Sequence, residues 1–417
     1  MLHAATTLGF LGYTFIGTQP LSDPSAAQRV DGSSLDRIVV LGLFALALAT
    51  LAANWRASLS LALRNVGVVG LVLFCLASLA WSDHPDLTIR RAILLVMLTT
   101  AAAAVAAGAR DLRRMHTLLF VTLAAVALLN LATVVVAPGL AISDLGVKGI
   151  YSQKNVAGAI MMVAAVIGAS WTLGATDRRS VGLGLLGLAP ILLLLVATRS
   201  KTSIALAGFA LAALLALWLF ERLGPRAIAL AVTGVAVLAA GFIALVAASG
   251  FDVGRLAETL TGDATFTGRD ELWKFALEKS LERPWLGHGY GAFWDVGPGA
   301  DPLLRVDPGS WLGDVETGTI NQAHNGYLEL WLQVGLPAMV IAAAITLFRS
   351  VSSARRFVAE PMRHGDRWMM ATLGMILALM LVHNLSEASL FMRGIPLCNV
   401  AMLAMFLSSG RHATRPL

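Results

Sequence analysis

The chain has 417 residues, of which 57% are hydrophobic and 13% are charged, and its mean hydropathy is +0.75. In soluble domains about a quarter of the residues are charged, so this composition excludes a soluble globular protein, a disordered chain and a soluble nucleic-acid binder. The net charge of +6 arises from the excess of basic residues in one set of the connections between apolar segments. Its two cysteines, Cys75 and Cys398, lie in apolar segments and predict neither a disulfide framework nor a zinc site.

Apolar stretches long enough to cross a bilayer recur along the chain, which predicts an all-α polytopic membrane protein with about twelve transmembrane helices. The first stretch is the weakest, but it has no basic segment before it and no clear cleavage site after it, so we expect a retained helix and not a signal peptide. The twelve helices are expected near residues 4–18, 38–53, 66–81, 90–108, 116–137, 156–174, 182–198, 203–220, 227–249, 326–348, 369–384 and 390–408.

The connections between these helices alternate in charge. One set of connections carries 16 of the 31 basic residues but five of the 25 acidic residues, a net charge of +11, and the other set carries a net charge of −5. Because short cytoplasmic loops are enriched in Lys and Arg, the first set is expected to be cytoplasmic, together with both termini.

Three parts follow from this topology: residues 1–249 with helices one to nine, residues 250–325 as one large periplasmic loop, and residues 326–417 with helices ten to twelve and a cytoplasmic tail. The loop should contain short helices. Thr267-Gly-Arg-Asp270 resembles a capping box, which predicts a helix that runs to about Glu282 and is terminated by Pro284.

Two cations, Arg199 and Lys201, occupy a short outer loop on the side that is poorer in cations. An ionisable group at membrane depth costs about 2.5–3.5 kcal/mol on insertion scales and often marks a functional cavity. Arginine can grip phosphate oxygens with two hydrogen bonds, so a lipid diphosphate is the expected ligand. The alternative is that both side chains extend to outer headgroups without any further role.

His324 lies where the large loop enters the tenth predicted helix, and histidine is a suitable proton acceptor near neutral pH. His288 and His383 are rival candidates that residue types alone do not rank. Lys154 and Asn155 lie at the mouth of the sixth predicted helix, where the lysine is either part of an anion site or an ordinary interfacial anchor.

Three motifs together resemble the O-antigen ligase and polysaccharide polymerase family: Gly149-Ile-Tyr-Ser-Gln-Lys-Asn155, the pair Gly268-Arg269, and His324-Asn-Gly-Tyr-Leu-Glu329 followed by Gly335. The run Pro284-Trp-Leu-Gly-His-Gly-Tyr-Gly291 is also typical of that family. The resemblance covers about residues 150–340, and the layout of twelve helices extends it over the chain.

The resemblance implies metal-independent glycosyl transfer on the periplasmic face of a bacterial inner membrane, without a cofactor. It implies a glycan donor on undecaprenyl diphosphate and an acceptor that is either lipid A-core or another glycan. His324 would be the general base, and Arg199 and Arg269 would bind the diphosphate. Lesser binding candidates are Lys201 and Lys154, and the supporting candidates are Asn325 and Asn155.

Ligase and polymerase activities share this donor chemistry, so the sequence leaves the acceptor open. A polytopic secondary transporter or a flippase for lipid-linked glycans is the rival function. Transporters often show internal repeats with broken helices at matched positions, whereas this sequence shows no convincing similarity between its halves and has one large one-sided loop.

Overall fold

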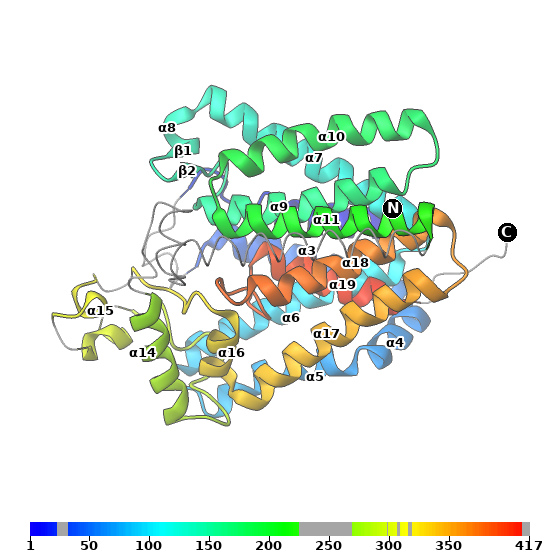
Figure 1. Ribbon diagram of the computed structural model, residues 1–417. Helices are drawn as coiled ribbons and strands as arrows, with labels where there is room; N and C mark the ends of the chain where they lie inside the picture. Colours follow the sequence, from blue (N-terminus) through cyan, green and yellow to red (C-terminus); the bar gives the residue numbers. More distant parts are fainter. Residues whose placement is uncertain (23–31, 225–268, 298, 307–308, 316–318, 411–417) are drawn as a thin grey trace.

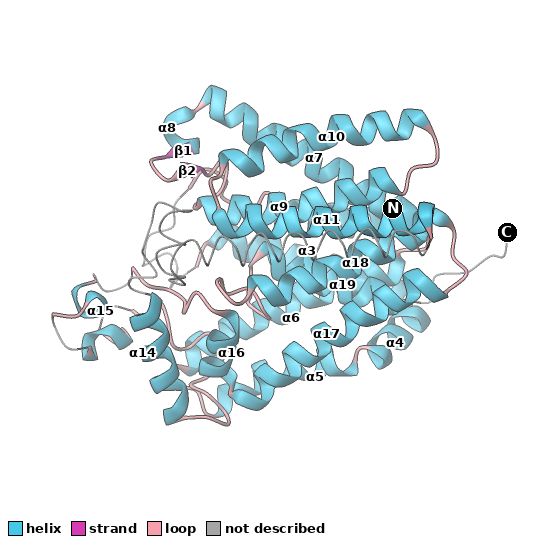
Figure 2. Cartoon of the chain, in the orientation of Figure 1, coloured by secondary structure: helices cyan, strands magenta, loops and turns pink. Residues whose placement is uncertain are grey.

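The computed structural model describes residues 1–22, 32–224, 269–297, 299–306, 309–315 and 319–410. The described chain is almost wholly helical, and its long helices run side by side in a bundle (Figures 1 and 2). Its elements are α1 (Leu2–Phe15), α3 (Ser34–Ala53), α4 (Trp55–Arg64), α5 (Val66–Ala77), η1 (Ser78–Ala80), α6 (Pro85–Gly108), α7 (Leu112–Val136), α8 (Pro138–Ala141), β1 (Ile142–Ser143), β2 (Gly146–Val147), α9 (Lys154–Leu173), α10 (Arg178–Ala197), α11 (Lys201–Leu223), α14 (Arg269–Glu282), η2 (Pro302–Arg305), α15 (Trp311–Asp314), α16 (Gly326–Val334), α17 (Leu336–Ala359), α18 (His364–His383) and α19 (Pro396–Ser409).

Eight helices in the described part of the chain are long and apolar enough to cross a membrane, namely α3, α6, α7, α9, α10, α11, α17 and α18. A ninth span results if α4 and the helical stretch Val66–Ala80, which meet at a bend of 82°, are counted together. The protein is therefore an all-α, multi-pass membrane protein.

Five of the twelve predicted helices differ from prediction or lie outside the described residues. The helix predicted at 66–81 corresponds to α5 and η1, which make up a span only when they are counted together with α4. The predicted helix at 227–249 lies outside them. At the two ends of the chain, α1 and α19 are each 14 residues long, too short to pass the length criterion for a span. The predicted helix at 326–348 is divided into α16 and α17 at Gly335, whose φ of +88° is left-handed and stops the first helix.

The centre of the bundle is α9, which packs against α7, α10, α11 and α18 and is the most buried span. Its sequence is rich in Ala, Gly and Met, and small residues let helices approach closely in a membrane. A Cβ at Gly158, for example, would lie 2.6 Å from the Cβ of Ser200 at the start of α11. The close packing fixes the mouth of α9 against the α10–α11 connection.

Between α14 and α16 the chain builds a second, smaller apolar core. Nine buried residues form it: Leu272, Phe275, Ala276, Phe293, Trp294, Leu303, Leu312, Ala323 and Leu332. The indole of Trp273 also donates a hydrogen bond of 3.0 Å to the carbonyl of Ala323. As predicted, α14 ends at Glu282, two residues before Pro284. This core fixes the segment that leads into His324.

The β1–β2 hairpin, α14, α15 and α16 lie at the same end of the bundle, at the left of Figure 1. The predicted cytoplasmic connections α9–α10 and α17–α18 lie at the other end. All segments with candidate residues are therefore gathered at one end of the molecule.

Candidate functional site

Glu387, in the connection between α18 and α19, is the centre of the polar contacts at this end. Its Oε2 accepts a hydrogen bond of 3.1 Å from Nδ1 of His324, and its Oε1 accepts one of 3.1 Å from Nδ2 of Asn155. A guanidinium nitrogen of Arg269 lies 3.6 Å from Oε1. One carboxylate thus joins three predicted site residues that are far apart in the sequence.

The backbone around Glu387 is held by the side chain of Asn384. Its Oδ1 accepts hydrogen bonds of 2.8 Å from the backbone N–H groups of Ser389 and Leu390, and its Nδ2 donates to the carbonyl of Met380. Asn384 is completely buried, where unpaired polar atoms are costly. This bonding closes the turn that carries Glu387.

The position of His324 is set by the start of α16. Asn325 is the N-cap, and its Oδ1 accepts hydrogen bonds from the N–H groups of Tyr327 and Leu328 at 3.1 and 3.2 Å. Gly326 donates its N–H to the carbonyls of Asn384 and Glu387 at 2.8 and 3.0 Å. These bonds attach the start of α16 directly to the turn that carries the carboxylate.

His324 itself has a left-handed backbone with φ of +48°. For a residue other than glycine this conformation is uncommon, and such residues cluster at functional sites. The fold holds it there because Asn325 and Gly326, the next two residues, are both fixed by hydrogen bonds.

The hydrogen bond to Glu387 determines which imidazole nitrogen of His324 carries the proton. Burial alone raises the pKa of the Glu387 carboxyl, but the hydrogen bond and charge of His324 and the charge of Arg269 outweigh burial, and the pKa lies below its usual value. An ionised carboxylate requires a proton on Nδ1, so Nε2 of neutral His324 has a free lone pair. Within the described residues, no hydrogen-bond partner occupies Nε2. The ring is half-buried and is oriented as a proton acceptor.

The three remaining cations of the predicted site lie at the same end of the bundle, but they do not contact Glu387 in the part of the chain that the structure describes. Arg199, in the α10–α11 connection, is exposed and left-handed at φ +52°. Among the described residues no hydrogen bond or ion pair joins it to His324 or Glu387. Lys201 opens α11 and is exposed. Lys154 donates a hydrogen bond of 3.0 Å to the carbonyl of Leu145 in the β1–β2 turn, which fits the interpretation as an anchor.

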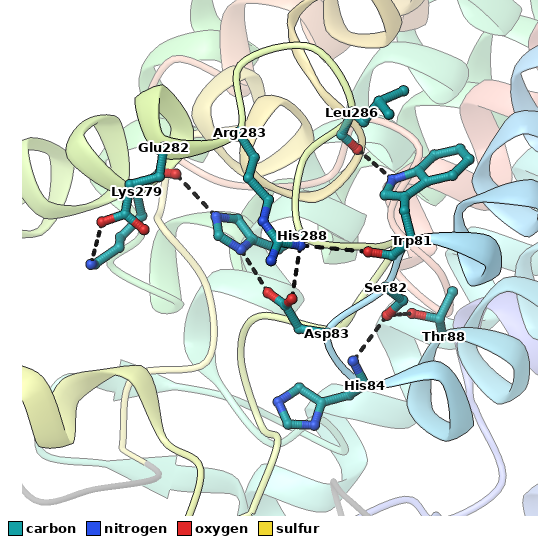
Figure 3. Close-up of polar contacts among 10 residues, drawn as sticks. All are labelled: Trp81, Ser82, Asp83, His84, Thr88, Lys279, Glu282, Arg283, Leu286 and His288. Atoms are coloured by element: carbon teal, nitrogen blue, oxygen red, sulfur yellow. Dashed lines mark hydrogen bonds and ion pairs between the residues drawn. The ribbon is translucent and has the colours of Figure 1, made fainter.

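The rival histidine His288 is fully engaged in a separate network (Figure 3). Its Nδ1 lies 2.8 Å from Oδ2 of Asp83 and its Nε2 lies 3.0 Å from the carbonyl of Lys279. Arg283 contacts the other oxygen of Asp83 at 2.8 Å. Because oxygen acceptors face both ring nitrogens, neither nitrogen is available to take a proton from a substrate. His288 ties the α5–α6 connection to α14.

The other rival, His383, is the last residue of α18 and is 5% exposed. Its Nδ1 lies 3.3 Å from the hydroxyl of Ser389. A buried ring with a hydroxyl partner is poorly placed to meet a substrate, so His324 is the best-placed base of the three.

Next to this centre lies a cavity of about 310 Å³, a size within the range of small-molecule sites. Three short segments each give one residue to the centre and others to the cavity wall: 152–156, 321–324 and 387–393. The polar side chains of the wall include Gln153, Asn321, Gln322, Gln333, Arg91 and Arg393. Amide and guanidinium groups of this kind can bind sugar hydroxyls. Among the described residues, no group of three or more His, Cys, Asp or Glu side chains is placed to hold a metal ion.

Sequence reasoning did not identify Glu387 or Arg393. Both lie in the connection between α18 and α19, where no motif was recognised, and Arg393 falls inside the helix predicted at 390–408. A usable signal was the charge pattern, since Glu387 follows His383 by four residues in a short loop on the predicted outer face. Its partners Asn155 and His324 are 232 and 63 residues away, and only the folded chain shows those pairings.

The sequence model of a family described as O-antigen ligase matches residues 185–343. The matched segment includes Arg199, Arg269 and His324, whereas Asn155 and Glu387 lie outside it. No curated protein matches the chain.

Proposed function

Since the family model described as O-antigen ligase matches residues 185–343, we propose that the chain acts as a member of this family and transfers a glycan from undecaprenyl diphosphate to an acceptor hydroxyl. The acceptor is lipid A-core in ligation or a second glycan in polymerisation. The reaction takes place on the periplasmic face of the bacterial inner membrane. The observation that carries the proposal is the pairing of His324 with Glu387 beside a polar cavity.

In the proposed reaction, Nε2 of His324 takes the proton from the acceptor hydroxyl as its oxygen attacks C1 of the donor sugar. Glu387 keeps the other proton on Nδ1 and stabilises the imidazolium that forms, as carboxylates do for catalytic histidines. A new bond forms between C1 and the acceptor oxygen while the bond between C1 and the phosphate oxygen breaks. The electron pair leaves with the lipid diphosphate.

Arg199 and Arg269 are proposed to neutralise the charge that develops on the departing diphosphate. Arg269 contacts both Glu387 and the carbonyl of Ser386, at 3.6 and 3.0 Å, which places a cation next to the base. Lys201 and Lys154 would add positive charge nearby. Because arginine cations supply this stabilisation, the proposed transfer needs no added metal ion.

The proposal is tested with full-length protein in liposomes that contain a lipid-linked glycan and an acceptor, in the presence of EDTA. General-base assistance is worth roughly 10²–10⁴-fold in rate, so His324→Ala should lose at least that order of activity. His364→Ala is the matched control, because His364 is exposed at the opposite end of the bundle. Transfer by His324→Ala at the wild-type rate would refute the role of this histidine.

A further inference from the structure

A groove of about 350 Å³ lies between α3 and α6, apart from the candidate centre. Part of its wall is apolar and is formed by Val40, Leu41, Ile93, Leu94 and Met97. Leu41 and Ile93 are exposed, so in a bilayer the groove is open to lipid. The apolar wall is therefore suited to contact a hydrocarbon chain that enters from the side.

The mouth of the groove is strongly basic. Four arginines line it, Arg37, Arg90, Arg91 and Arg393. Among the described lining residues the one acid is Asp36, which accepts a hydrogen bond of 2.9 Å from Thr18 and one of 3.5 Å from Tyr13. The excess of positive charge above an apolar wall complements an anionic lipid headgroup.

Arg91 and Arg393 also line the cavity beside His324, so the groove and the cavity share a wall. Both side chains lie against Gly291, where a Cβ would be 2.9 Å from Cδ of Arg91 and 3.2 Å from a guanidinium nitrogen of Arg393. Arg91 is fixed by hydrogen bonds to the carbonyls of Gly291, Trp294 and Asp295. The two arginines therefore form an arginine junction between an apolar groove and a polar cavity, and the cavity side of this junction also carries Asp295 and Glu329.

The apolar groove, the arginine junction and the polar cavity follow one another, and a lipid-linked glycan has an apolar, an anionic and a polar part in the same order. We propose that the groove and the cavity together bind a second lipid-linked glycan, the acceptor, whose hydrocarbon chain lies between α3 and α6. Its phosphate lies on the arginine junction, and its sugars occupy the cavity and reach His324. This inference rests on the proposed transferase function and adds the site that holds the lipid anchor and the phosphate of the acceptor.

The groove is separate from the arginine proposed to bind the donor. Arg199 lies between α10 and α11, which pack on α9, α7 and α18, whereas α3 packs on α6 and α1. The proposed donor and acceptor thus approach His324 from different faces of the bundle, and each keeps its lipid in the membrane.

The test counts binding sites for farnesyl diphosphate on the full-length protein in phosphatidylcholine nanodiscs, by native mass spectrometry. We expect two sites in the wild type. The double variant Arg37→Gln/Arg90→Gln should lose affinity at one of them by roughly tenfold or more, since it removes two of the four arginines that line the groove. Arg178→Gln/Arg179→Gln, a pair of exposed arginines at the other end, should keep both sites.

A single site in the wild type, or two unchanged sites in Arg37→Gln/Arg90→Gln, would overturn the proposal. So would equal binding of neutral farnesol, which would make the groove merely apolar. A diphosphorylated lipid A distinguishes the two kinds of acceptor. If the acceptor is a phosphorylated glycolipid, lipid A displaces farnesyl diphosphate from the groove and from no other site. If the acceptor is carried on a prenyl diphosphate, lipid A does not displace farnesyl diphosphate from the groove. Two sites without any glycan transfer would support the groove and refute the proposed reaction.

Discussion

The carboxylate of Glu387 orients the imidazole ring of His324 and places a negative charge beside it. The imidazole can rotate about its side-chain bonds, and the hydrogen bond from Nδ1 selects one orientation and one tautomer. Asn155 and Arg269 fix the carboxylate in turn. The proposed base is therefore held in position by a second layer of contacts, which lowers the cost of ordering it for reaction.

We expect Glu387→Gln to lower kcat by roughly 10²–10⁴-fold, the order associated with the base itself, while KM changes little. The amide keeps the size of the side chain but can present its NH₂ group to Nδ1 and favour the wrong tautomer. Steady-state kinetics in liposomes measures both constants. The matched control is Glu360→Gln, an ion-paired glutamate beyond the end of α17, and an equal loss in both variants would contradict the role of Glu387.

For the anion site, Arg199→Ala is expected to reduce transfer by roughly 10²–10³-fold, the typical loss when one group that stabilises developing charge is removed. Because Arg199 is exposed, the variant should accumulate normally in the membrane. Arg269→Lys should also be impaired, since lysine lacks the planar fork of arginine. Arg178→Ala, at the opposite end, is the control. Unimpaired transfer by Arg199→Ala would mean that its side chain only reaches outer headgroups.

The sequence identified His324, Arg269 and Asn155 as candidates, and the structure brings these three together at one carboxylate. The part that could not be predicted is that carboxylate. The motifs recognised in the sequence do not include Glu387, and its significance depends on contacts that join the α18–α19 connection to α9, to α14 and to the start of α16.

At the scale of elements, the start of α16 and the α18–α19 connection behave as one unit. Gly326 is the point of closest approach, because a Cβ there would lie 1.7 Å from Oδ1 of the buried Asn384. The glycine therefore permits the two backbone hydrogen bonds that hold His324 next to Glu387.

Gly326→Ala should displace the start of α16 and destabilise the protein by about 1–3 kcal/mol, the usual cost of overpacking. Transfer should fall with the loss of the contact between His324 and Glu387. Thermal unfolding in detergent and the transfer assay measure the two effects. Gly208→Ala on α11 is the control, because a Cβ there meets no atom within 4 Å. Similar melting temperatures for both variants would show that the contact is not tight.

Hydrophobic periodicity predicted most of the long helices and the helix that ends before Pro284. It could not show the break at Gly335, because the residues on both sides of that glycine are apolar and continue the pattern. A single left-handed residue interrupts a helix without changing mean hydropathy. It also could not resolve the short lengths of α1 and α19.

The distribution of charge predicts which end of the bundle faces the cytoplasm. Reporter fusions after Arg178 and Arg356 should report a cytoplasmic location, and a fusion near Gly299 should report a periplasmic one. The reason is the excess of basic residues in the connections at one end of the bundle. A cytoplasmic signal at Gly299 would invert the protein and separate the proposed centre from a periplasmic donor.

The counts of charged residues assign the segments that carry the candidate residues to one side of the membrane. In the fold the same segments lie at one end of the bundle, together with the β1–β2 hairpin and α14. What the counts could not give is the depth and direction of the openings. The groove between α3 and α6 depends on which side chains of two helices face each other, and this is fixed by packing and not by composition.

Glu387 follows all three of its contact partners in the order of synthesis. Asn155, Arg269 and His324 leave the ribosome earlier than their common partner. A nascent chain that lacks the α18–α19 connection therefore lacks the carboxylate that contacts the other three residues. In the proposed mechanism such a chain has no oriented base, so we expect it to leave lipid-linked glycans unused in the membrane.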